Sequence, residues 1–268
     1  MKPFLLSACI VAALIAAVVP PTISWPPGDR SRPLPAKVTA DPGSPPSDAV
    51  VLFDGQSLAA WQQSNGKPAA WRVRDGYFEV APGSGDLVTI QPFGDCQLHL
   101  EWATPSPPQG TDQEPGNSGV YMMSNYEIQV LDSFRNQTYA DGQAAAVYGQ
   151  YPPLVNASRP SGEWQSYDIV FHGPRFGAAA ELLRLATLTL LHNGVLVQDH
   201  VRLTGPTDYM NRPPYRPHPE KMPLLLQDHG QPVRYRNIWI RELVTAAATA
   251  PAAPLAPQSL TPRPQQSK

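Results

Sequence analysis

The placement of proline along this 268-residue chain excludes a bundle of long helices. The chain has 33 prolines, of which nine fall in residues 20–48 and five in residues 251–264. Eighteen remain in residues 49–244, and an interior proline removes a helix hydrogen bond and clashes with the preceding turn. We therefore expect residues 49–244 to fold as short strands and turns, between two proline-rich flanks that do not pack into a core.

The N-terminal flank has the pattern of an export segment. Lys2 precedes an apolar run over residues 4–19, which suits a secretion signal and is short for a membrane-spanning helix. We interpret residues 1–19 as a signal peptide or an N-terminal membrane anchor, residues 20–48 as a proline-rich linker, and residues 245–268 as a disordered Ala/Pro-rich tail. The expected location is the periplasm, or the cell envelope with a retained membrane tether.

Charge and cysteine content exclude several classes of partner and site. The net charge is −2 and charged residues make up 16% of the chain, so no basic field is available to attract a nucleic acid. The chain has two cysteines, Cys9 and Cys96, and Cys9 lies in the apolar run. A disulfide framework or a cysteine-rich zinc site is therefore excluded, and we expect Cys96 to be buried.

Residues 49–244 show the alternation and turn signals of antiparallel strands. Apolar and polar residues alternate over residues 96–102 and 164–172, as in strands with one buried face. Asp75-Gly76 and Asn193-Gly194 each separate two apolar runs, which is typical of tight hairpins. About eleven such strands are expected, and together they predict an antiparallel sandwich.

The segment 126–132 (YEIQVLD) carries the most chemical information. In a strand, Ile128 would face a core while Glu127 and Gln129 share the opposite face. Paired donors and acceptors on such a face suit sugar hydroxyls, and a carboxylate can also move protons; an ordinary solvated face is the alternative. Asp132 is five positions from Glu127, so only a bulge would bring the two carboxyl groups together.

A second polar stretch begins near residue 227, where an apolar strand ends. Gln227 and His229 fall on one face, and Arg234 and Arg236 share a face after the turn. A histidine there can serve as base, acid or metal ligand, and arginines can hold a polyhydroxyl substrate or orient Glu127. A turn histidine bonded to backbone is the alternative. Asn117, before another apolar strand, marks either a site edge or a plain turn.

Taken in order, these segments resemble the 3-keto-disaccharide hydrolase domain family over residues 49–243. Each block is weak alone, but their order along one domain is specific. The sequence contains no GxSxG, P-loop, HExxH or Rossmann glycine pattern that would compete. The matching blocks are residues 51–61 (VLFDGQSLAAW), 117–120 (NSGV), 126–132 (YEIQVLD), 193–194 (NG), 227–230 (QDHG) and 234–240 (RYRNIWI).

The resemblance implies a fold, a substrate class and a setting. The implied fold is a concanavalin A-like jelly-roll sandwich of two antiparallel sheets, with the substrate groove on the concave sheet. The implied activity is cleavage of 3-keto glycosides or disaccharides by exported bacterial proteins, alongside a sugar 3-dehydrogenase that would supply the ketone. Glu127-x-Gln129-x-x-Asp132 is also similar to the Glu-x-Asp-x-x-Glu strand of β-glucanases with this jelly roll, but two of its three acids differ.

A 3-keto sugar can be cleaved without two paired carboxylates. The ketone acidifies the hydrogen on carbon 2, so one base, one oxyanion stabiliser and one acid suffice for elimination followed by hydration. The candidate base and acid are Glu127 and His229, in either order, and Asp132 is a further catalytic candidate. Arg236, or a divalent metal ion held by His229, would stabilise the oxyanion. The expected substrate-binding residues are Asn117, Gln129, Gln227, Arg234 and Arg236.

Three other interpretations remain open from the sequence. A non-catalytic, lectin-like module would use the same sandwich and the same polar groove to bind a small carbohydrate. A classical glycosidase would need two carboxyl groups about 5 Å apart for double displacement. An envelope interaction protein would need only the fold, the tether and the tail.

Overall fold

The computed structural model describes residues 28, 30 and 34–243. Residues 37–243 belong to one structural unit, to which the following description refers. The expected signal or anchor at residues 1–19 and the tail at residues 245–268 lie outside the described residues. In the part of the chain that the structure describes, no helix is long and apolar enough to cross a membrane.

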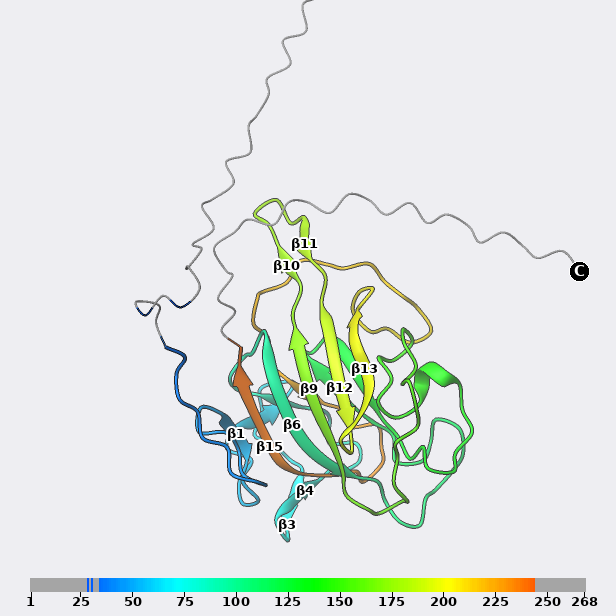
Figure 1. The fold of residues 1–268 in the computed structure, drawn as a ribbon. Helices are drawn as coiled ribbons and strands as arrows, with labels where there is room; N and C mark the ends of the chain where they lie inside the picture. Colours follow the sequence, from blue (N-terminus) through cyan, green and yellow to red (C-terminus); the bar gives the residue numbers. More distant parts are fainter. Residues whose placement is uncertain (1–27, 29, 31–33, 244–268) are drawn as a thin grey trace, which may run out of the picture. The chain divides into compact units, whose positions relative to one another are not determined.

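Two antiparallel sheets pack as a sandwich, as expected for the jelly roll (Figure 1). The larger sheet has the order β13-β12-β9-β6-β15-β4-β3, with β1 also paired to β15, and the smaller has the order β2-β5-β14-β7-β8. The remaining pair, β10 and β11, forms a separate ribbon. The strands are β1 (Val50–Phe53), β2 (Trp61–Gln63), β3 (Arg72–Arg74), β4 (Tyr77–Glu79), β5 (Leu87–Thr89), β6 (Cys96–Ala103), β7 (Ser118–Met122), β8 (Tyr126–Val130), β9 (Gln165–His172), β10 (Arg175–Phe176), β11 (Leu182–Arg184), β12 (Thr187–His192), β13 (Val195–Arg202), β14 (Leu225–Leu226) and β15 (Arg234–Glu242).

The all-β prediction is confirmed, and fifteen strands are found among the described residues where about eleven were expected. Both predicted tight hairpins form. Asn193 (φ 53°) and Gly194 (φ 79°) join β12 to β13, and Asp75 (φ 48°) and Gly76 (φ 80°) join β3 to β4. Two consecutive residues with positive φ define the type I′ turn, whose twist matches that of the strands it joins. The helical content of residues 34–243 is one 3₁₀ turn, η1 (Ala140–Gly142).

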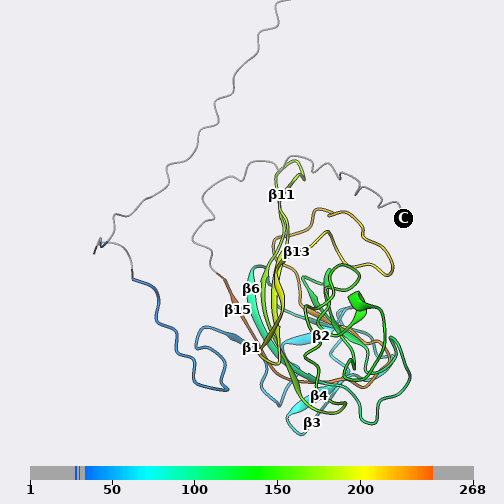
Figure 2. The same ribbon diagram turned by 45° about the vertical axis from the view of Figure 1, so that its right-hand side comes forward.

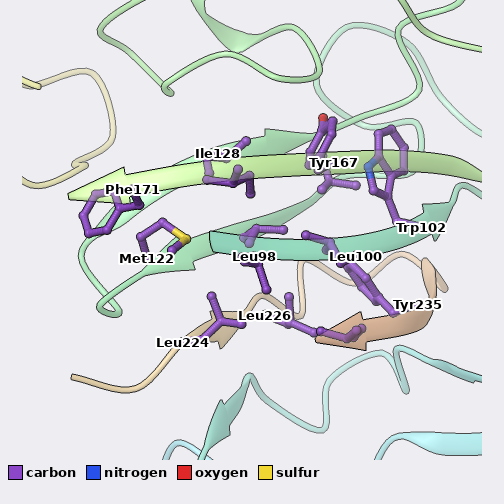
Figure 3. Close-up of a cluster of buried hydrophobic side chains, with 14 of the residues drawn as sticks. Leu98, Leu100, Trp102, Met122, Ile128, Tyr167, Phe171, Leu224, Leu226 and Tyr235 are labelled. Carbon is purple, nitrogen blue, oxygen red and sulfur yellow. The ribbon is translucent and has the colours of Figure 1, made fainter. Parts of the chain in front are cut away.

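The core lies between the two sheets and is built from the inward-facing residues of both. In β6 and β9 every second side chain is buried, which is the alternation seen in the sequence. Figure 3 shows the side chains of β6, β9 and β15 facing Met122, Ile128 and Leu226 of the smaller sheet. Cys96 belongs to this core, as expected, and burial raises the pKa of its thiol.

Polar bonds inside the core fix the smaller sheet to the larger one. The Tyr167 hydroxyl donates to the Gln129 carbonyl at 2.8 Å, joining β9 to β8. The Tyr235 hydroxyl lies 2.7 Å from Ser118 Oγ, which in turn donates to the Gln227 carbonyl at 2.6 Å. These buried contacts hold β7, β8 and the end of β14 in a single register. The outward faces of these strands therefore present their side chains in fixed positions.

The connections of the smaller sheet are long and cover its outer face. In Figure 2 the larger sheet is seen almost edge-on, and the connection between β8 and β9 lies on the same side as β2. Part of that connection pairs with the free edge of β8, because the Gln129 N–H donates to the Ala146 carbonyl at 3.0 Å and the Tyr148 N–H donates to the Glu127 carbonyl at 3.3 Å. Loops from several parts of the chain thus meet above β7 and β8.

Candidate active site

A cavity of about 690 Å³ opens on the outer face of the smaller sheet. Its floor consists of side chains from β7, β8 and the residues that follow β14, and its walls come from the long loops. The lining is rich in carboxyl, amide and phenol groups. The lining residues are Asp112, Gln113, Asn117, Tyr121, Glu127, Gln129, Tyr139, Tyr148, Thr207, Asp208, Tyr209, Gln227 and His229.

Glu127 is the buried carboxyl group of this cavity. It lies on β8 directly opposite Tyr121 of β7 and is only 5% exposed. Burial raises the pKa of Glu127 to about 7, and a hydrogen bond from Tyr121 opposes that rise to a smaller extent. None of the described residues that line the cavity is lysine or arginine. Glu127 can therefore accept or release a proton near neutral pH, as a general base or acid must.

A glycine makes room for the Glu127 carboxyl group. Gly119 of β7 lies on the same face of the sheet as Tyr121, one pleat along the strand. A Cβ atom at Gly119 would lie 2.6 Å from Glu127 Oε1 and 2.6 Å from Tyr121 Cε2. Real Cβ atoms do not approach other heavy atoms this closely, so any larger residue at position 119 would displace the carboxyl group.

Amide and hydroxyl groups hold Glu127 on two sides. With its amide nitrogen turned toward Glu127, Gln129 donates to Glu127 Oε1 at 3.1 Å and to the Ser118 carbonyl at 3.2 Å. The backbone N–H of Glu127 donates to Thr207 Oγ1 at 2.9 Å, which ties the loop after β13 to β8. The carboxyl group is thus set among neutral groups that restrict its rotation.

Three tyrosines supply hydroxyl donors around Glu127. The hydroxyls of Tyr139 and Tyr148 lie 2.6 Å apart, and the Gln227 side chain donates to the Tyr121 hydroxyl at 3.3 Å. Burial raises the pKa of Tyr121 and Tyr148, and the charge of Glu127 adds to that rise. All three phenols therefore stay protonated at neutral pH. They can donate hydrogen bonds to a negatively charged oxygen that develops in the cavity.

The cavity brings together most of the site residues expected from the sequence. Glu127, Gln129, Asn117, Gln227 and His229 all line it, although the first and last are about 100 positions apart. Asn117 donates to the Gln113 carbonyl at 2.6 Å and so also fixes a wall of the cavity. His229 is exposed at the rim. The roles assigned to these residues stay predictions.

Asp132 is not among the residues that line the cavity. Strand β8 ends at Val130, and the pairing of β7 with β8 contains no bulge that would turn Asp132 toward Glu127. Its carboxyl group is buried and accepts hydrogen bonds from the Ser161 hydroxyl and from the Phe134 N–H. The structure therefore contradicts a shared site for Glu127 and Asp132, and Asp132 has the contacts of a structural residue.

The expectation that Arg234 and Arg236 face the same groove is also wrong. Both lie on β15, which belongs to the larger sheet. Arg234 donates to the Gly162 carbonyl at 3.1 Å and lines a different hollow. Arg236 donates to Glu101 at 2.7 Å, and its guanidinium lies 4.1 Å from the centre of the Trp164 ring. The side chains of Arg234 and Arg236 therefore make their contacts on the larger sheet and not in this cavity.

Several lining residues were not found by sequence reasoning. Tyr121 could have been identified, because it alternates with the buried Val120 and Met122 and so must face the same side as Glu127. Gln113, Tyr139, Tyr148 and the segment 207–209 lie in irregular loops, where no periodicity indicates the direction of a side chain. Among the described residues, no group of three or more His, Cys, Asp or Glu residues is placed to hold a metal ion.

A jelly-roll sandwich with a polar cavity around one buried carboxyl group is suited to binding a carbohydrate, and the carboxyl group can also move a proton. Comparison with protein families makes the class specific. Residues 48–241 match the family described as the 3-keto-α-glucoside-1,2-lyase-like domain. The chain belongs to this family, as its sequence blocks had indicated, and it is an enzyme of the glycoside hydrolase class.

Individual relatives agree with this assignment. A protein of Bacteroides thetaiotaomicron named 3-keto-disaccharide hydrolase is 25% identical over 239 residues, which cover 72% of this chain and 78% of the relative. A solved structure from Parabacteroides distasonis, assigned as a glycosyl hydrolase, is 42% identical with a TM-score of 0.75, covering 79% of this chain and 93% of its own. A second solved structure from that organism, 21% identical with a TM-score of 0.54, shares the fold and covers 74% of this chain and 94% of its own.

Proposed function

We propose that this protein cleaves 3-keto glycosides, including 3-keto disaccharides, by elimination across carbons 1 and 2 followed by hydration. The observation that carries the proposal is the buried Glu127 carboxyl group, whose pKa is raised to about 7 in a cavity whose described lining contains no lysine or arginine. One such base is sufficient when the substrate itself supplies an acidic hydrogen. The relative named 3-keto-disaccharide hydrolase supports the substrate class.

The proposed reaction starts at carbon 2. Ionised Glu127 takes the hydrogen from carbon 2, and the electron pair of that bond forms the enolate of the 3-ketone. The enolate then collapses, the bond between carbon 1 and the leaving oxygen breaks, and that oxygen takes up a proton. The product is an unsaturated ketone, and addition of water across its double bond gives the free 3-keto sugar. The net reaction is hydrolysis.

The cavity offers a group for each remaining role. The Tyr139 and Tyr148 hydroxyls use one proton between them, so the other proton of this pair can be donated to the enolate oxygen, while Tyr121 donates to Glu127. His229 lies at the exposed rim, which suits protonation of a leaving group that departs toward solvent. Asn117, Gln129 and Gln227 provide amides for the sugar hydroxyls, and this arrangement favours Glu127 as the base and His229 as the acid.

We further propose that the protein works outside the cytoplasm on the product of a sugar 3-dehydrogenase. The apolar run at residues 4–19 supports export, and the need for a ketone at carbon 3 supports a preceding oxidation. Fusion of residues 1–48 to a reporter that is active only outside the cytoplasm tests export. An active fusion supports it, and an inactive fusion with normal expression contradicts it.

A substrate pair tests the proposed activity. The purified protein is incubated with a 3-keto disaccharide and, in parallel, with the unoxidised parent disaccharide. We expect sugar release from the 3-keto compound alone. Equal release from the parent would instead indicate a two-carboxylate glycosidase that pairs Glu127 with Asp112 or Asp208 of the same cavity. Binding of both compounds without release would indicate a lectin-like module.

A further inference from the structure

A second hollow of about 440 Å³ lies against the candidate active site. Tyr139 and Tyr148 line both this hollow and the main cavity, so their paired rings form the wall between the two spaces. A substrate whose reacting carbons lie beside Glu127 could therefore extend past these phenols into the second hollow. The residues that line it are Tyr139, Asp141, Tyr148, Gly149, Met210, Asn211 and Arg212.

A tight turn over residues 208–211 carries two exposed apolar side chains between the two spaces. Tyr209, which lines the main cavity, is 71% exposed, and Met210, which lines the second hollow, is 74% exposed. The Asn211 N–H closes the turn on the Asp208 carbonyl at 3.4 Å. Met210 has a φ of 58°, a left-handed conformation that is unfavourable for such a side chain.

The turn is held at both ends. On one side the Thr207 N–H donates to the Asn125 carbonyl at 2.8 Å, and on the other Arg212 Nε donates to the Gly149 carbonyl at 2.7 Å. These bonds fix the strained turn in place beside the cavity. Exposed apolar side chains that are held in a strained turn beside a cavity are more typical of a ligand contact than of ordinary protein surface.

The two spaces differ in chemistry. The main cavity offers carboxylates, amides and hydroxyls, which suit a sugar ring. The second hollow offers aromatic rings and the thioether of Met210, and its charged pair, Arg212 and Asp141, lies 3.7 Å apart. Thioether and aromatic surfaces favour apolar partners, and aromatic ones in particular.

We propose that this hollow binds the leaving group of the 3-keto glycoside and that it favours an aryl or arylalkyl alcohol over a second sugar. The inference rests on the proposed function and leaves its bond changes unaltered. The bond that breaks still joins carbon 1 to the oxygen of the leaving alcohol. The sugar ring occupies the main cavity beside Glu127, and the apolar group lies past Tyr139 and Tyr148 against Met210.

The test compares two 3-keto substrates in one variant and a matched control. The substrates are 2-phenylethyl 3-keto-α-glucoside and a 3-keto disaccharide of two glucose units, and each is compared only with itself between the variant and the unmodified protein. The variant is Met210→Asn, because asparagine tolerates the left-handed backbone. The control is Leu154→Asn, an equally apolar side chain that is 65% exposed and does not line either space.

We expect Met210→Asn to lower kcat/KM for the phenylethyl substrate by about tenfold, because an apolar contact is lost. The same variant should change kcat/KM for the disaccharide by less than about twofold. Leu154→Asn should change neither. Equal losses on both substrates, or a loss confined to the disaccharide, would overturn the apolar subsite.

A binding measurement separates failure of the subsite from failure of the proposed function. Calorimetry with unoxidised 2-phenylethyl α-glucoside and with methyl α-glucoside requires no turnover. Tighter binding of the phenylethyl compound that is lost in Met210→Asn supports the subsite even if neither 3-keto substrate is cleaved. Equal affinity for the two glucosides in the unmodified protein would overturn the subsite whether or not cleavage occurs.

Discussion

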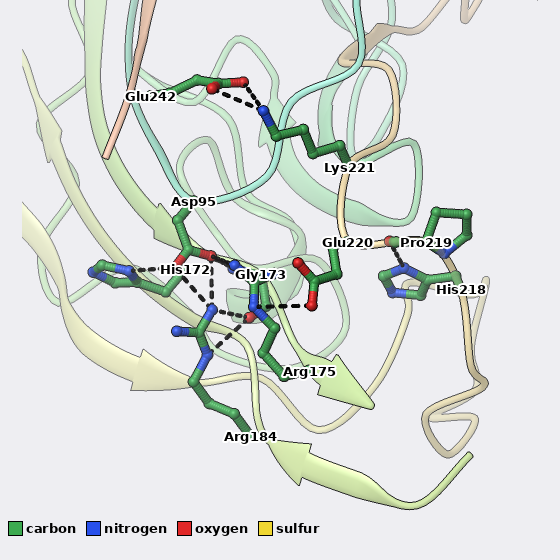
Figure 4. Close-up of polar contacts among 10 residues, drawn as sticks. All are labelled: Asp95, His172, Gly173, Arg175, Arg184, His218, Pro219, Glu220, Lys221 and Glu242. Carbon is green, nitrogen blue, oxygen red and sulfur yellow. Dashed lines mark hydrogen bonds and ion pairs between the residues drawn. The ribbon is translucent and has the colours of Figure 1, made fainter. Parts of the chain in front are cut away.

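Asp95 and Glu127 are two carboxyl groups that are buried to the same degree and used in opposite ways. Asp95 is 6% exposed and Glu127 is 5% exposed. Burial alone would raise the pKa of Asp95, but hydrogen bonds and charge from Arg184, with Arg175 and His172, outweigh it and hold the pKa below its usual value (Figure 4). Among the residues that the structure describes, no cationic side chain contacts Glu127 in this way, and its pKa is raised to about 7.

The difference shows that the groups around a buried carboxyl group, and not its burial alone, decide whether its pKa is raised or lowered. Asp95 is ionised at neutral pH and joins β6 to the β10–β11 ribbon through Arg184, so its charge stabilises the fold. Glu127 faces a cavity whose described lining contains no lysine or arginine, so its charge is costly and its proton is exchangeable. A buried acid with neutral neighbours is the arrangement expected of a proton-transfer site.

The largest expected effect is on activity after Glu127→Gln. This change keeps the shape of the side chain and removes its basicity, so kcat/KM for a 3-keto glycoside should fall by about 10²–10⁴. Asp132→Asn is the control, because Asp132 lies outside the cavity, and it should retain most of the activity. Comparable losses in both variants would indicate that the two carboxyl groups act together.

A second variant tests the position of Glu127 and not its chemistry. In Gly119→Ala the new Cβ would meet Glu127 Oε1 at 2.6 Å, and displacement of the base should lower kcat by about 10². Gly173→Ala is the matched control, since its Cβ would meet Met123 Sδ at 2.8 Å away from the cavity. Unchanged kcat in Gly119→Ala would show that the carboxyl group has room to move without loss.

Neutralising the two acids should change stability in opposite directions. The pKa of Glu127 is 4.5 in its ordinary state and about 7 in the folded protein, so its ionisation opposes folding as pH rises through this interval. At pH 8, Glu127→Gln should therefore raise the free energy of unfolding, by at most about 3 kcal/mol.

Asp95→Asn should lower the free energy of unfolding at pH 8 by about 1–3 kcal/mol. Its lowered pKa makes the ion pairs fully present above pH 3.8, and the substitution removes the negative charge that faces Arg184. Urea titrations of both variants beside the unmodified protein measure the two changes. If both variants were less stable than the unmodified protein, the ionised Glu127 carboxyl group would also stabilise the fold.

The pH dependence of activity reports the ionisation of Glu127 directly. A base must be ionised to act, so kcat/KM should rise about tenfold per pH unit below pH 7 and stop rising above it. The profile is measured with a 3-keto glycoside over the range in which the protein stays folded. A midpoint near pH 4.5 would indicate that the reacting carboxyl group has an ordinary environment.

The sequence predicted best what depends on local periodicity. Alternation placed Glu127 and Gln129 on one face of a strand, and Asn193-Gly194 identified a hairpin, because both depend on neighbouring residues only. The same rule put Arg234 and Arg236 on a shared face but could not reveal that their strand joins the larger sheet. Strand pairing is set by contacts between distant residues, which one local pattern does not contain.

Loop residues were harder to predict for a related reason. Tyr139 and Tyr148 meet at 2.6 Å because their segment pairs with the edge of β8, a long-range event with no local signature. Asp132 was placed near Glu127 only by resemblance to the catalytic strand of β-glucanases. Convergence of the two carboxyl groups would require a bulge between them. Strand β8 instead ends at Val130, before Asp132.

Turnover of a 3-keto glycoside in deuterated water tests most directly whether Glu127 takes the hydrogen from carbon 2. Elimination breaks the carbon–hydrogen bond at carbon 2, and hydration returns a hydrogen from solvent to that carbon. We predict one deuterium at carbon 2 of the released 3-keto sugar, read by mass spectrometry and NMR at early conversion, and no release by Glu127→Gln on the same timescale. Rapid release of a sugar without deuterium at carbon 2 would contradict elimination and indicate direct displacement at carbon 1.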